Sequence, residues 1–216
     1  MSFIIDEFII TNTTEPIYSI LKEGVSNFFA ELNKYISDNG DADILTYANE
    51  MTLASLFLCG NVRRNPDITG VQEYGVSCKK KEKGFRGKPD IFMRKKANAV
   101  WIECKNQKKI KPLKEDHWNI DAWLDWDKNK IFIQLEDYYE AEKNEINDTY
   151  ERHFLVSLCF KSIQEEEIKH LRLVQKKLRA VRNLEYQRGW FYQVGFQNTN
   201  AKKQLGIEVY GTFIEK

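Results

Sequence analysis

Two carboxylates and one amine stand close together near the middle of the sequence. Asp90 lies in the segment GKPDIFM, and Glu103 and Lys105 end the segment AVWIECK at residues 99–105. Alternation along a strand separates two faces, of which the apolar one is made by Val100, Ile102 and Cys104. Glu103 and Lys105 share the opposite face, so an acid and an amine project side by side from the end of a strand.

The preceding segment predicts a hairpin that brings a second carboxylate to the first. Proline cannot donate to a sheet ladder, so Pro89 suits the start of a strand and places Asp90 at its beginning. With a turn at residues 94–98, this strand would pair with 99–105 and bring Asp90 close to Glu103. Two carboxylates at that range repel each other unless a cation lies between them. Oxygen ligands of this type suit Mg²⁺, which usually takes one or two protein carboxylates and keeps waters.

The pattern P-D…E-C-K, with twelve residues between Asp90 and Glu103, resembles the PD-(D/E)xK nuclease superfamily, which has the restriction-endonuclease-like fold. The expected elements around it follow in the order helix, three strands, helix and fourth strand, which is also similar to that core. The resemblance covers roughly residues 43–163. It implies an α/β (α+β) protein whose mixed sheet is flanked by helices.

This resemblance implies metal-assisted hydrolysis of phosphodiester bonds. Asp90, Glu103 and the backbone carbonyl of Cys104 would hold Mg²⁺, for which Mn²⁺ would substitute. Lys105 would position and polarise the attacking water and offset charge in the transition state. The metal would lower the pKa of that water and clamp the reacting oxygens, and the cuts would leave 5′-phosphate ends. The alternative for these residues is an exposed hairpin with an ordinary surface ion pair.

Many members of this superfamily carry an acid on the helix before the first strand, and Glu50 matches that position. Glu50 lies three residues before Leu53 and seven before Phe57, so helical spacing puts it on or beside an inward stripe. There it would act as a further catalytic residue, holding the ion through water or helping to hold a second ion. The alternative is a boundary glutamate whose carboxylate extends to solvent.

A second motif lies downstream. Gln134 and Tyr138 are four residues apart in an expected helix, so their side chains share a face. The pair is similar to the Q-x-x-x-Y signature of the RecB-like branch of the superfamily, in which these side chains approach the site or the DNA. The alternative is a surface glutamine beside a packed tyrosine.

Basic segments flank the proposed site in the sequence. Residues 61–114 contain 16 Lys and Arg and 5 Asp and Glu, a net charge of +11, although the net charge of the whole chain is +1. The candidate nucleic-acid-binding residues of this block are Lys79, Lys80, Lys83, Arg86, Lys88, Lys108 and Lys109. Phosphate binding by such residues would depend strongly on salt concentration. The alternative is that these charges only form solvated faces.

Hydrophobic periodicity and turn residues predict the remaining elements. Helices are expected at about 17–36, 44–59, 131–143 and 164–182, with Gly60 ending the second. Strands are expected at about 71–78, 90–93, 99–105, 153–163, 190–196 and 206–213. We therefore expect one domain over residues 1–216. It comprises a core at about 43–163, an N-terminal helical extension at 1–42, and a C-terminal helix and strands at 164–216.

Composition and missing motifs exclude several classes of protein. A chain of 216 residues with 42% hydrophobic and 30% charged residues is not wholly disordered. No apolar run approaches the ~18 residues of a membrane span, so we expect no membrane partner. Four widely spaced cysteines favour a reducing, cytoplasmic setting. The absence of a P-loop, a nucleophile elbow and a dinucleotide-binding glycine motif argues against an ATP-driven motor.

These observations lead to a Mg²⁺-dependent nuclease, acting on DNA, as the expected function. One alternative is a non-catalytic nucleic-acid-binding module on the same fold. Another is a protein-interaction domain built from the acidic segment that contains Trp118, Trp123 and Trp126. A homodimer is compatible with the first reading, because cutting both strands with one site per chain requires two sites. Endonuclease or exonuclease action, DNA or RNA preference, sequence specificity and biological role stay open.

Overall fold

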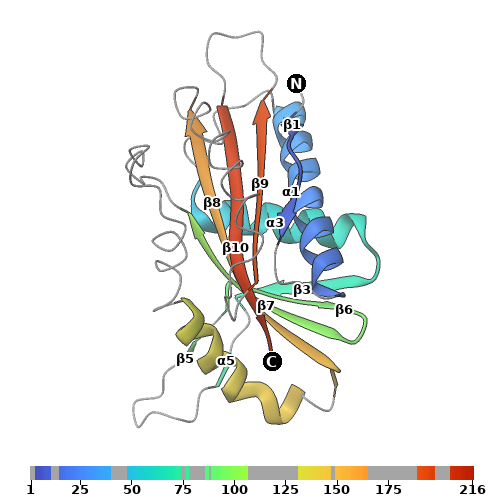
Figure 1. Cartoon of the computed structure of the whole chain (residues 1–216), viewed down its shortest axis with the longest axis vertical. Coiled ribbons are helices and arrows are strands. Elements are labelled where there is room, and N and C mark those ends of the chain that lie inside the picture. The colour runs from blue at the N-terminus through green and yellow to red at the C-terminus, as the bar shows by residue number, and fades with distance from the viewer. Residues whose placement is uncertain are drawn as a thin grey trace.

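The computed structural model describes residues 3–10, 15–39, 48–73, 76–77, 86–87, 89–106, 131–146, 149–164, 189–197 and 205–216, and it is a mixed α/β structure. Its helices are α1 (Ile17–Asn39), α3 (Glu50–Arg64) and α5 (Ile131–Ile146). Its strands are β1 (Phe3–Ile5), β2 (Ile9–Ile10), β3 (Ile68–Gln72), β4 (Val76–Ser77), β5 (Arg86–Gly87), β6 (Ile91–Lys95), β7 (Asn98–Asn106), β8 (Arg152–Gln164), β9 (Gly189–Gln197) and β10 (Leu205–Glu215). Figure 1 shows these elements along the chain.

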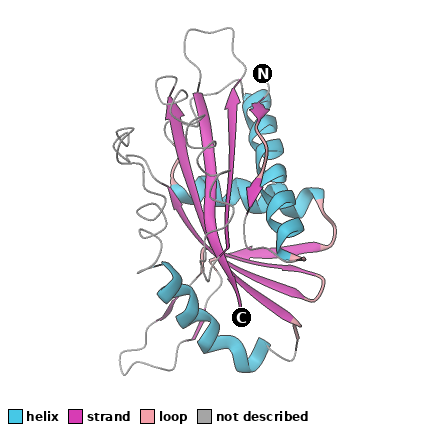
Figure 2. Cartoon of the chain, viewed as in Figure 1, coloured by secondary structure: helices cyan, strands magenta, loops and turns pink. Residues whose placement is uncertain are grey.

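Eight strands form one mixed sheet in the order β1-β9-β10-β8-β7-β6-β3, with β2 also paired to β9. Strands β7 and β8 are parallel, and the other described pairs of this sheet are antiparallel. A parallel pair needs a crossover, and α5 lies between β7 and β8 in the sequence. Strands β4 and β5 form a separate two-stranded sheet. Figure 2 shows that the strand direction changes across the large sheet.

One face of the sheet packs against α1 and α3. The apolar residues of α1 recur at helical spacing, and its buried side chains, including Phe28 and Leu32, enter the main hydrophobic core. This core also contains Phe57 of α3 and the apolar side chains Val100, Ile102 and Cys104 of β7. The alternation expected for β7 is therefore confirmed, because its apolar face is the one that meets these helices.

The helix expected at 44–59 begins and ends later than the sequence indicates. In the structure α3 begins at Glu50, and residues 41–47 lie outside the described part of the chain. Gly60 does not end α3, because the helix continues to Arg64. A Cβ atom at Gly60 would lie 2.6 Å from the carbonyl oxygen of Asn27 in α1, so this glycine permits the close approach of two helices. The expectation that Gly60 is a C-cap is wrong for this reason.

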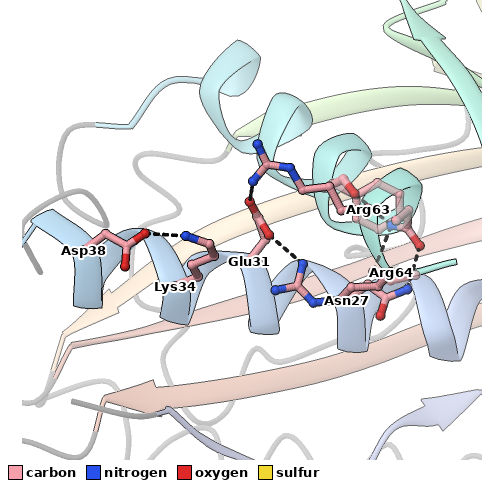
Figure 3. A network of polar contacts seen from close by, with 9 residues as sticks. Asn27, Glu31, Lys34, Asp38, Arg63 and Arg64 are labelled. Carbon is pink, nitrogen blue, oxygen red and sulfur yellow. Dashed lines mark hydrogen bonds and ion pairs between the residues drawn. The ribbon is translucent and has the colours of Figure 1, made fainter.

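Polar contacts hold α1 and α3 together where they meet. Glu31 of α1 is buried, and its two carboxylate oxygens each accept a hydrogen bond of 2.5 Å, one from Arg63 and one from Arg64. The amide of Asn61 donates to the Gly24 carbonyl oxygen over 3.1 Å. Figure 3 shows Glu31 between the two arginines. A buried carboxylate needs such partners, so these contacts fix how α3 lies on α1.

The other face of the sheet carries a second apolar cluster under α5. Trp101 of β7 and Leu155 of β8 pack against Leu135 and Tyr138 of α5. Trp101 is fully buried, so the face of β7 that also carries Glu103 is covered and not exposed. The helix expected at 131–143 is confirmed and extends to Ile146.

The strands differ from expectation mainly at their ends and near the N-terminus. Strand β3 begins at Ile68 and ends before Glu73, whose φ of 52° lies in the left-handed region, so the strand expected at 71–78 is shifted. The N-terminal segment contributes β1 and β2 to the sheet besides its helix, which corrects the expected purely helical extension. The strands expected at 153–163, 190–196 and 206–213 are confirmed as β8, β9 and β10.

Gln164, the first residue of the helix expected at 164–182, is the last residue of β8. The rest of that expected helix lies outside the described residues. Of the helices that the structure describes, none is long and apolar enough to cross a membrane.

Candidate active site

The predicted hairpin is present and sets the position of Asp90. Strand β6 pairs antiparallel with β7 with Ile91 opposite Ile102, so Asp90 directly precedes the paired region beside Glu103. The Asp90 Oδ2 atom accepts a hydrogen bond of 2.7 Å from the backbone N–H of Cys104. This hydrogen bond from the β7 backbone, together with the place of Asp90 directly before β6, holds the carboxylate against the end of β7.

Lys105 lies where three acidic side chains meet, which come from α3, from the residue before β6 and from β7 itself. Its Nζ atom is 3.0 Å from Glu103 Oε1, 3.3 Å from Glu50 Oε1 and 4.0 Å from Asp90 Oδ2. It also donates a hydrogen bond of 2.7 Å to the carbonyl oxygen of Cys104. All the residues that the sequence predicts as catalytic are therefore gathered around one ammonium group.

Glu50 reaches this cluster from the first turn of α3. Asn49 caps the helix, and its side-chain oxygen accepts a hydrogen bond of 2.8 Å from the Thr52 backbone N–H. Glu50 follows the cap directly, and its side chain is 39% exposed. Neither a buried residue of the core nor a fully solvated one, Glu50 lies at the edge of the site, with its carboxylate turned toward Lys105.

Burial controls the charge of the two carboxyl groups beside Lys105. Burial, and then the negative charge of Asp90, raise the pKa of Glu103 from 4.5 to about 7, against the opposing effect of Lys105. Burial also raises the pKa of Asp90, although the Cys104 N–H and the charge of Lys105 oppose it. The two carboxyl groups therefore share a region in which adding negative charge is costly.

The pKa of Lys105 is also raised, but for this ammonium group a raised pKa favours the charged form. Burial alone would lower the pKa of Lys105, but the charge of Glu103, the hydrogen bond to it and the charges of Glu50 and Asp90 raise that pKa above its usual value. Lys105 consequently stays protonated throughout the neutral range.

The donor set fits a hard divalent cation. Glu103 is 4% exposed, and its Oε2 atom is buried without a hydrogen-bond partner in the described part of the structure. Carboxylate oxygens of Asp90 and Glu103 and the Cys104 carbonyl oxygen are ligands of the kind that Mg²⁺ prefers. Among the described residues, no three His, Cys, Asp or Glu side chains are already arranged around a common point for an ion. Lys105 lies between the carboxylates instead.

Gln134 and Tyr138 contact each other on α5. The Gln134 side-chain amide donates a hydrogen bond to the Tyr138 hydroxyl oxygen. Tyr138 is 1% exposed and packs in the cluster that contains Trp101, so its ring is part of the core under α5. Gln134 is partly exposed and is the member of the pair that solvent reaches. The packing of Tyr138 therefore matches the alternative interpretation, in which a packed tyrosine lies beside a surface glutamine.

The candidate phosphate-binding residues are mostly beyond what the structure describes. Arg86 lies in β5, opposite Ser77 of β4, and its side chain is outside the described part. The six candidate lysines all lie outside the described residues: Lys79, Lys80, Lys83, Lys88, Lys108 and Lys109.

Two residues near the site are not predicted from the sequence: the last residue of β3 and the residue that follows it. Gln72 contacts α3 through its side chain, and the Glu73 backbone N–H donates a hydrogen bond of 2.9 Å to the Asp90 carbonyl oxygen. No motif marks either residue, because both contacts join segments that are distant in the chain.

Comparison of the sequence with protein-family models finds no match, and neither curated proteins nor solved structures provide one.

Proposed function

We propose that this protein is a divalent-cation-dependent nuclease that hydrolyses phosphodiester bonds, with DNA as its substrate. The proposal depends on one observation: Glu50, Asp90 and Glu103 come from three separate segments of the chain and surround Lys105. An ordinary surface ion pair has two exposed partners and contributes little to stability. Three acids around one amine, with Glu103 almost fully buried, is the costlier arrangement that functional sites contain.

Asp90, Glu103 and the Cys104 carbonyl would hold Mg²⁺ or Mn²⁺, and Glu50 would contribute through a water molecule or toward a second ion. The buried Oε2 atom of Glu103 supports this assignment, because it has no hydrogen-bond partner among the described residues. A bound cation of this kind supplies Lewis-acid stabilisation of phosphoryl oxygens and a water of lowered pKa.

Lys105 acts in this proposal as a fixed positive charge and hydrogen-bond donor. Its raised pKa means that it does not accept a proton near neutral pH, so it is not the general base. Its ammonium group can orient the attacking water and stabilise the negative charge that develops on the phosphoryl oxygens. Glu50 and Glu103 orient that ammonium through contacts of 3.3 and 3.0 Å.

The arrangement of elements also supports the restriction-endonuclease-like fold as the finer assignment. Among the strands of the large sheet, α3 is followed in chain order by β3, β6 and β7, then by α5 and β8, with the separate pair β4 and β5 between β3 and β6. The three early strands of the large sheet are successively antiparallel. Strand β8 is parallel to β7. This is the order of helix, three strands, helix and fourth strand that the sequence motif implies.

The test is DNA cleavage by the purified full chain. Plasmid and single-stranded DNA are incubated with Mg²⁺ or Mn²⁺, and in parallel with EDTA. We expect cleavage only with the divalent cation, and a fall of at least about a thousandfold in rate for Asp90→Ala and Lys105→Ala, because each removes stabilisation made in the transition state. Glu50→Gln should reduce the rate by roughly 10- to 100-fold without unfolding the protein.

Matched controls come from an exposed ion pair between the turn at the other end of the hairpin and the residue before β3. Lys96→Ala and Asp67→Ala each remove one exposed charge, with side chains 73% and 55% exposed, away from the acidic cluster. Both controls should cut DNA at the wild-type rate. Equal cutting by the Asp90 and Lys105 variants would contradict the proposal. DNA that is bound but uncut would favour the binding module, and no effect on any nucleic acid would favour the interaction domain.

A further inference from the structure

The end of β3 touches both α3 and the segment that carries Asp90. The Ser55 hydroxyl lies 2.9 Å from the Gln72 side-chain oxygen and 2.8 Å from the Met51 carbonyl oxygen, and its single proton is shared between these two acceptors. The amide nitrogen of Gln72 lies 3.1 Å from Met51 Sδ and 3.5 Å from the Met51 carbonyl oxygen. Met51 and Ser55 belong to the first two turns of α3, so Gln72 contacts the part of the helix that carries Glu50.

The next residue along the chain contacts the Asp90 segment. The Glu73 backbone N–H donates to the Asp90 carbonyl oxygen over 2.9 Å. Gln72 itself lies opposite Ile91, the residue after Asp90, in the pairing of β3 with β6. Gln72 and Glu73 therefore connect the start of α3 to Asp90 and to β6, the strand that begins directly after Asp90.

We propose that Gln72 is a positioning residue that holds the Glu50 carboxylate at its place beside Lys105 and Asp90. The inference rests on the proposed function, since it assigns Gln72 a role in building the cation site. It acts through Glu50 and does not itself touch the site.

The contacts of α3 explain why a polar side chain is needed for this task. The polar contacts of α3 with α1 lie in the last turns of the helix. Nearer its start, Leu53, Ala54 and Phe57 attach α3 to the core through apolar contacts, which are not directional. Such contacts hold the helix on the sheet but tolerate small rotations of its first turn, where Glu50 lies. The hydrogen bond between Ser55 and Gln72 is directional and restricts that rotation.

The first readout needs no cation. Gln72→Met keeps the length and volume of the side chain but removes its hydrogen bonds. We expect amide hydrogen exchange in the first two turns of α3 to rise roughly tenfold in this variant, while exchange in β7 stays unchanged. Thr69→Val is the matched control, because Thr69 lies on the same strand and its hydroxyl contacts Arg94 of β6 instead of α3.

The second readout tests whether Gln72 acts through Glu50. Binding of Mn²⁺ alone is measured by calorimetry for wild type, Gln72→Met, Glu50→Gln and the double variant. We expect Gln72→Met to weaken binding by roughly tenfold, as substitutions behind a ligand do. In the Glu50→Gln background the same change should have no further effect, whereas a general loss of stability would add to it.

The outcomes separate this inference from the proposed function. Unchanged exchange in α3, or additive effects on Mn²⁺ affinity, would overturn the positioning role even if the protein cuts DNA. Mn²⁺ binding with the expected coupling but without DNA cleavage would support the positioning role and contradict the nuclease. If the wild-type chain binds no Mn²⁺, the metal centre is contradicted, and Gln72 loses the assigned role as well.

Discussion

Glu103 and Lys105 lie two residues apart on β7, and their surroundings raise the pKa of both groups, which favours a neutral Glu103 but a charged Lys105. Burial favours the neutral form of Glu103, whereas the surrounding acids favour the charged form of Lys105. The ammonium offsets part of the repulsion among Glu50, Asp90 and Glu103. In the cation-free chain Lys105 is therefore a counter-ion for the cluster, and it contacts the same Cys104 carbonyl oxygen that we assign as a metal ligand.

Replacing Lys105 by methionine should therefore destabilise the cation-free chain. We expect a decrease of about 1–2 kcal/mol in the free energy of unfolding at pH 8 in EDTA, less than for a fully buried pair because Lys105 is 29% exposed. Mg²⁺ should stabilise Lys105→Met more than wild type, because no ammonium competes for Glu103 and the Cys104 carbonyl. Urea unfolding with and without Mg²⁺ measures both effects. Equal Mg²⁺ stabilisation of the two proteins would show that Lys105 does not occupy the ligands.

The pKa of Glu103 predicts a pH dependence of stability. Its pKa is about 7 in the folded chain against an ordinary value of 4.5, so between these values the folded state binds a proton that the unfolded state has released. Stability should then fall as pH rises from about 4.5 to about 7, by at most about 3 kcal/mol. Glu103→Gln should remove this fall.

His153 acts in the same pH range with the opposite sign. Burial lowers the pKa of His153, so its protonation favours unfolding and its effect on stability improves as pH rises. The measurement is therefore the difference between wild type and Glu103→Gln, from urea unfolding in EDTA at pH 5 and pH 8. A difference that is the same at both pH values would contradict the raised pKa.

At the level of elements, the crossing of α1 and α3 determines the position of the start of α3, where Glu50 lies. Helix α3 lies close enough to α1 that its Gly60 has no room for a side chain, and Glu31 receives two arginines of α3. Asn49 caps the helix, and Gln72 contacts its first turns. The position of Glu50 thus depends on packing at both ends of α3, besides the single contact to Lys105.

Gly60→Ala tests this packing. Alanine is the better helix former by about 1 kcal/mol, but its Cβ would lie 2.6 Å from a backbone oxygen of Asn27. Because backbone yields less than a side chain, we expect a net destabilisation of about 1–3 kcal/mol. Val62→Ala, at a 40% exposed position of the same helix, should change stability by less than about 0.5 kcal/mol. Thermal unfolding decides, and a stabilised Gly60→Ala variant would mean that the helices are farther apart.

In the whole molecule, one sheet includes both the N-terminal and the C-terminal strands. Strands β9 and β10 extend the sheet beyond β8, and β1 and β2 add to β9, so both ends of the chain join the structure that holds the site (Figure 1).

Charge is unevenly distributed along this chain. Residues 61–114 carry a net charge of +11, and residues 115–151, with 3 Lys and Arg and 12 Asp and Glu, carry −9.

This distribution predicts local and salt-dependent binding of nucleic acid. Changing Lys79, Lys80 and Lys83 together to Gln should weaken binding of a labelled DNA duplex in EDTA. The slope of log affinity against log salt should decrease by roughly 0.9 for each phosphate that the variant no longer neutralises. Fluorescence anisotropy across a salt series measures both. Changing Lys22, Lys34 and Lys96 to Gln removes the same charge elsewhere and should have a much smaller effect; an equal effect would indicate a response to net charge alone.

Local features were readable from the sequence. Helical spacing located α1 and α5, and alternation located β7 with its apolar face, because these patterns depend on neighbours a few residues apart. The Pro89–Asp90 start and the turn at 94–98 predicted the hairpin that brings Asp90 to Cys104. The chemistry of the site stays a proposal, since residue types and spacing constrain a reaction without demonstrating it.

Contacts between distant segments that no motif marks became visible only in the folded chain. Gln72 contacts Met51 across 21 residues, whereas the meeting of Glu50 and Lys105, 55 residues apart, was expected through the family resemblance alone. The same glycine that reads locally as a helix stop, Gly60, is a point of close approach in the structure. Periodicity reports which face of an element is apolar, but the partner of that face and the angle at which it packs depend on the volumes of all the side chains between them.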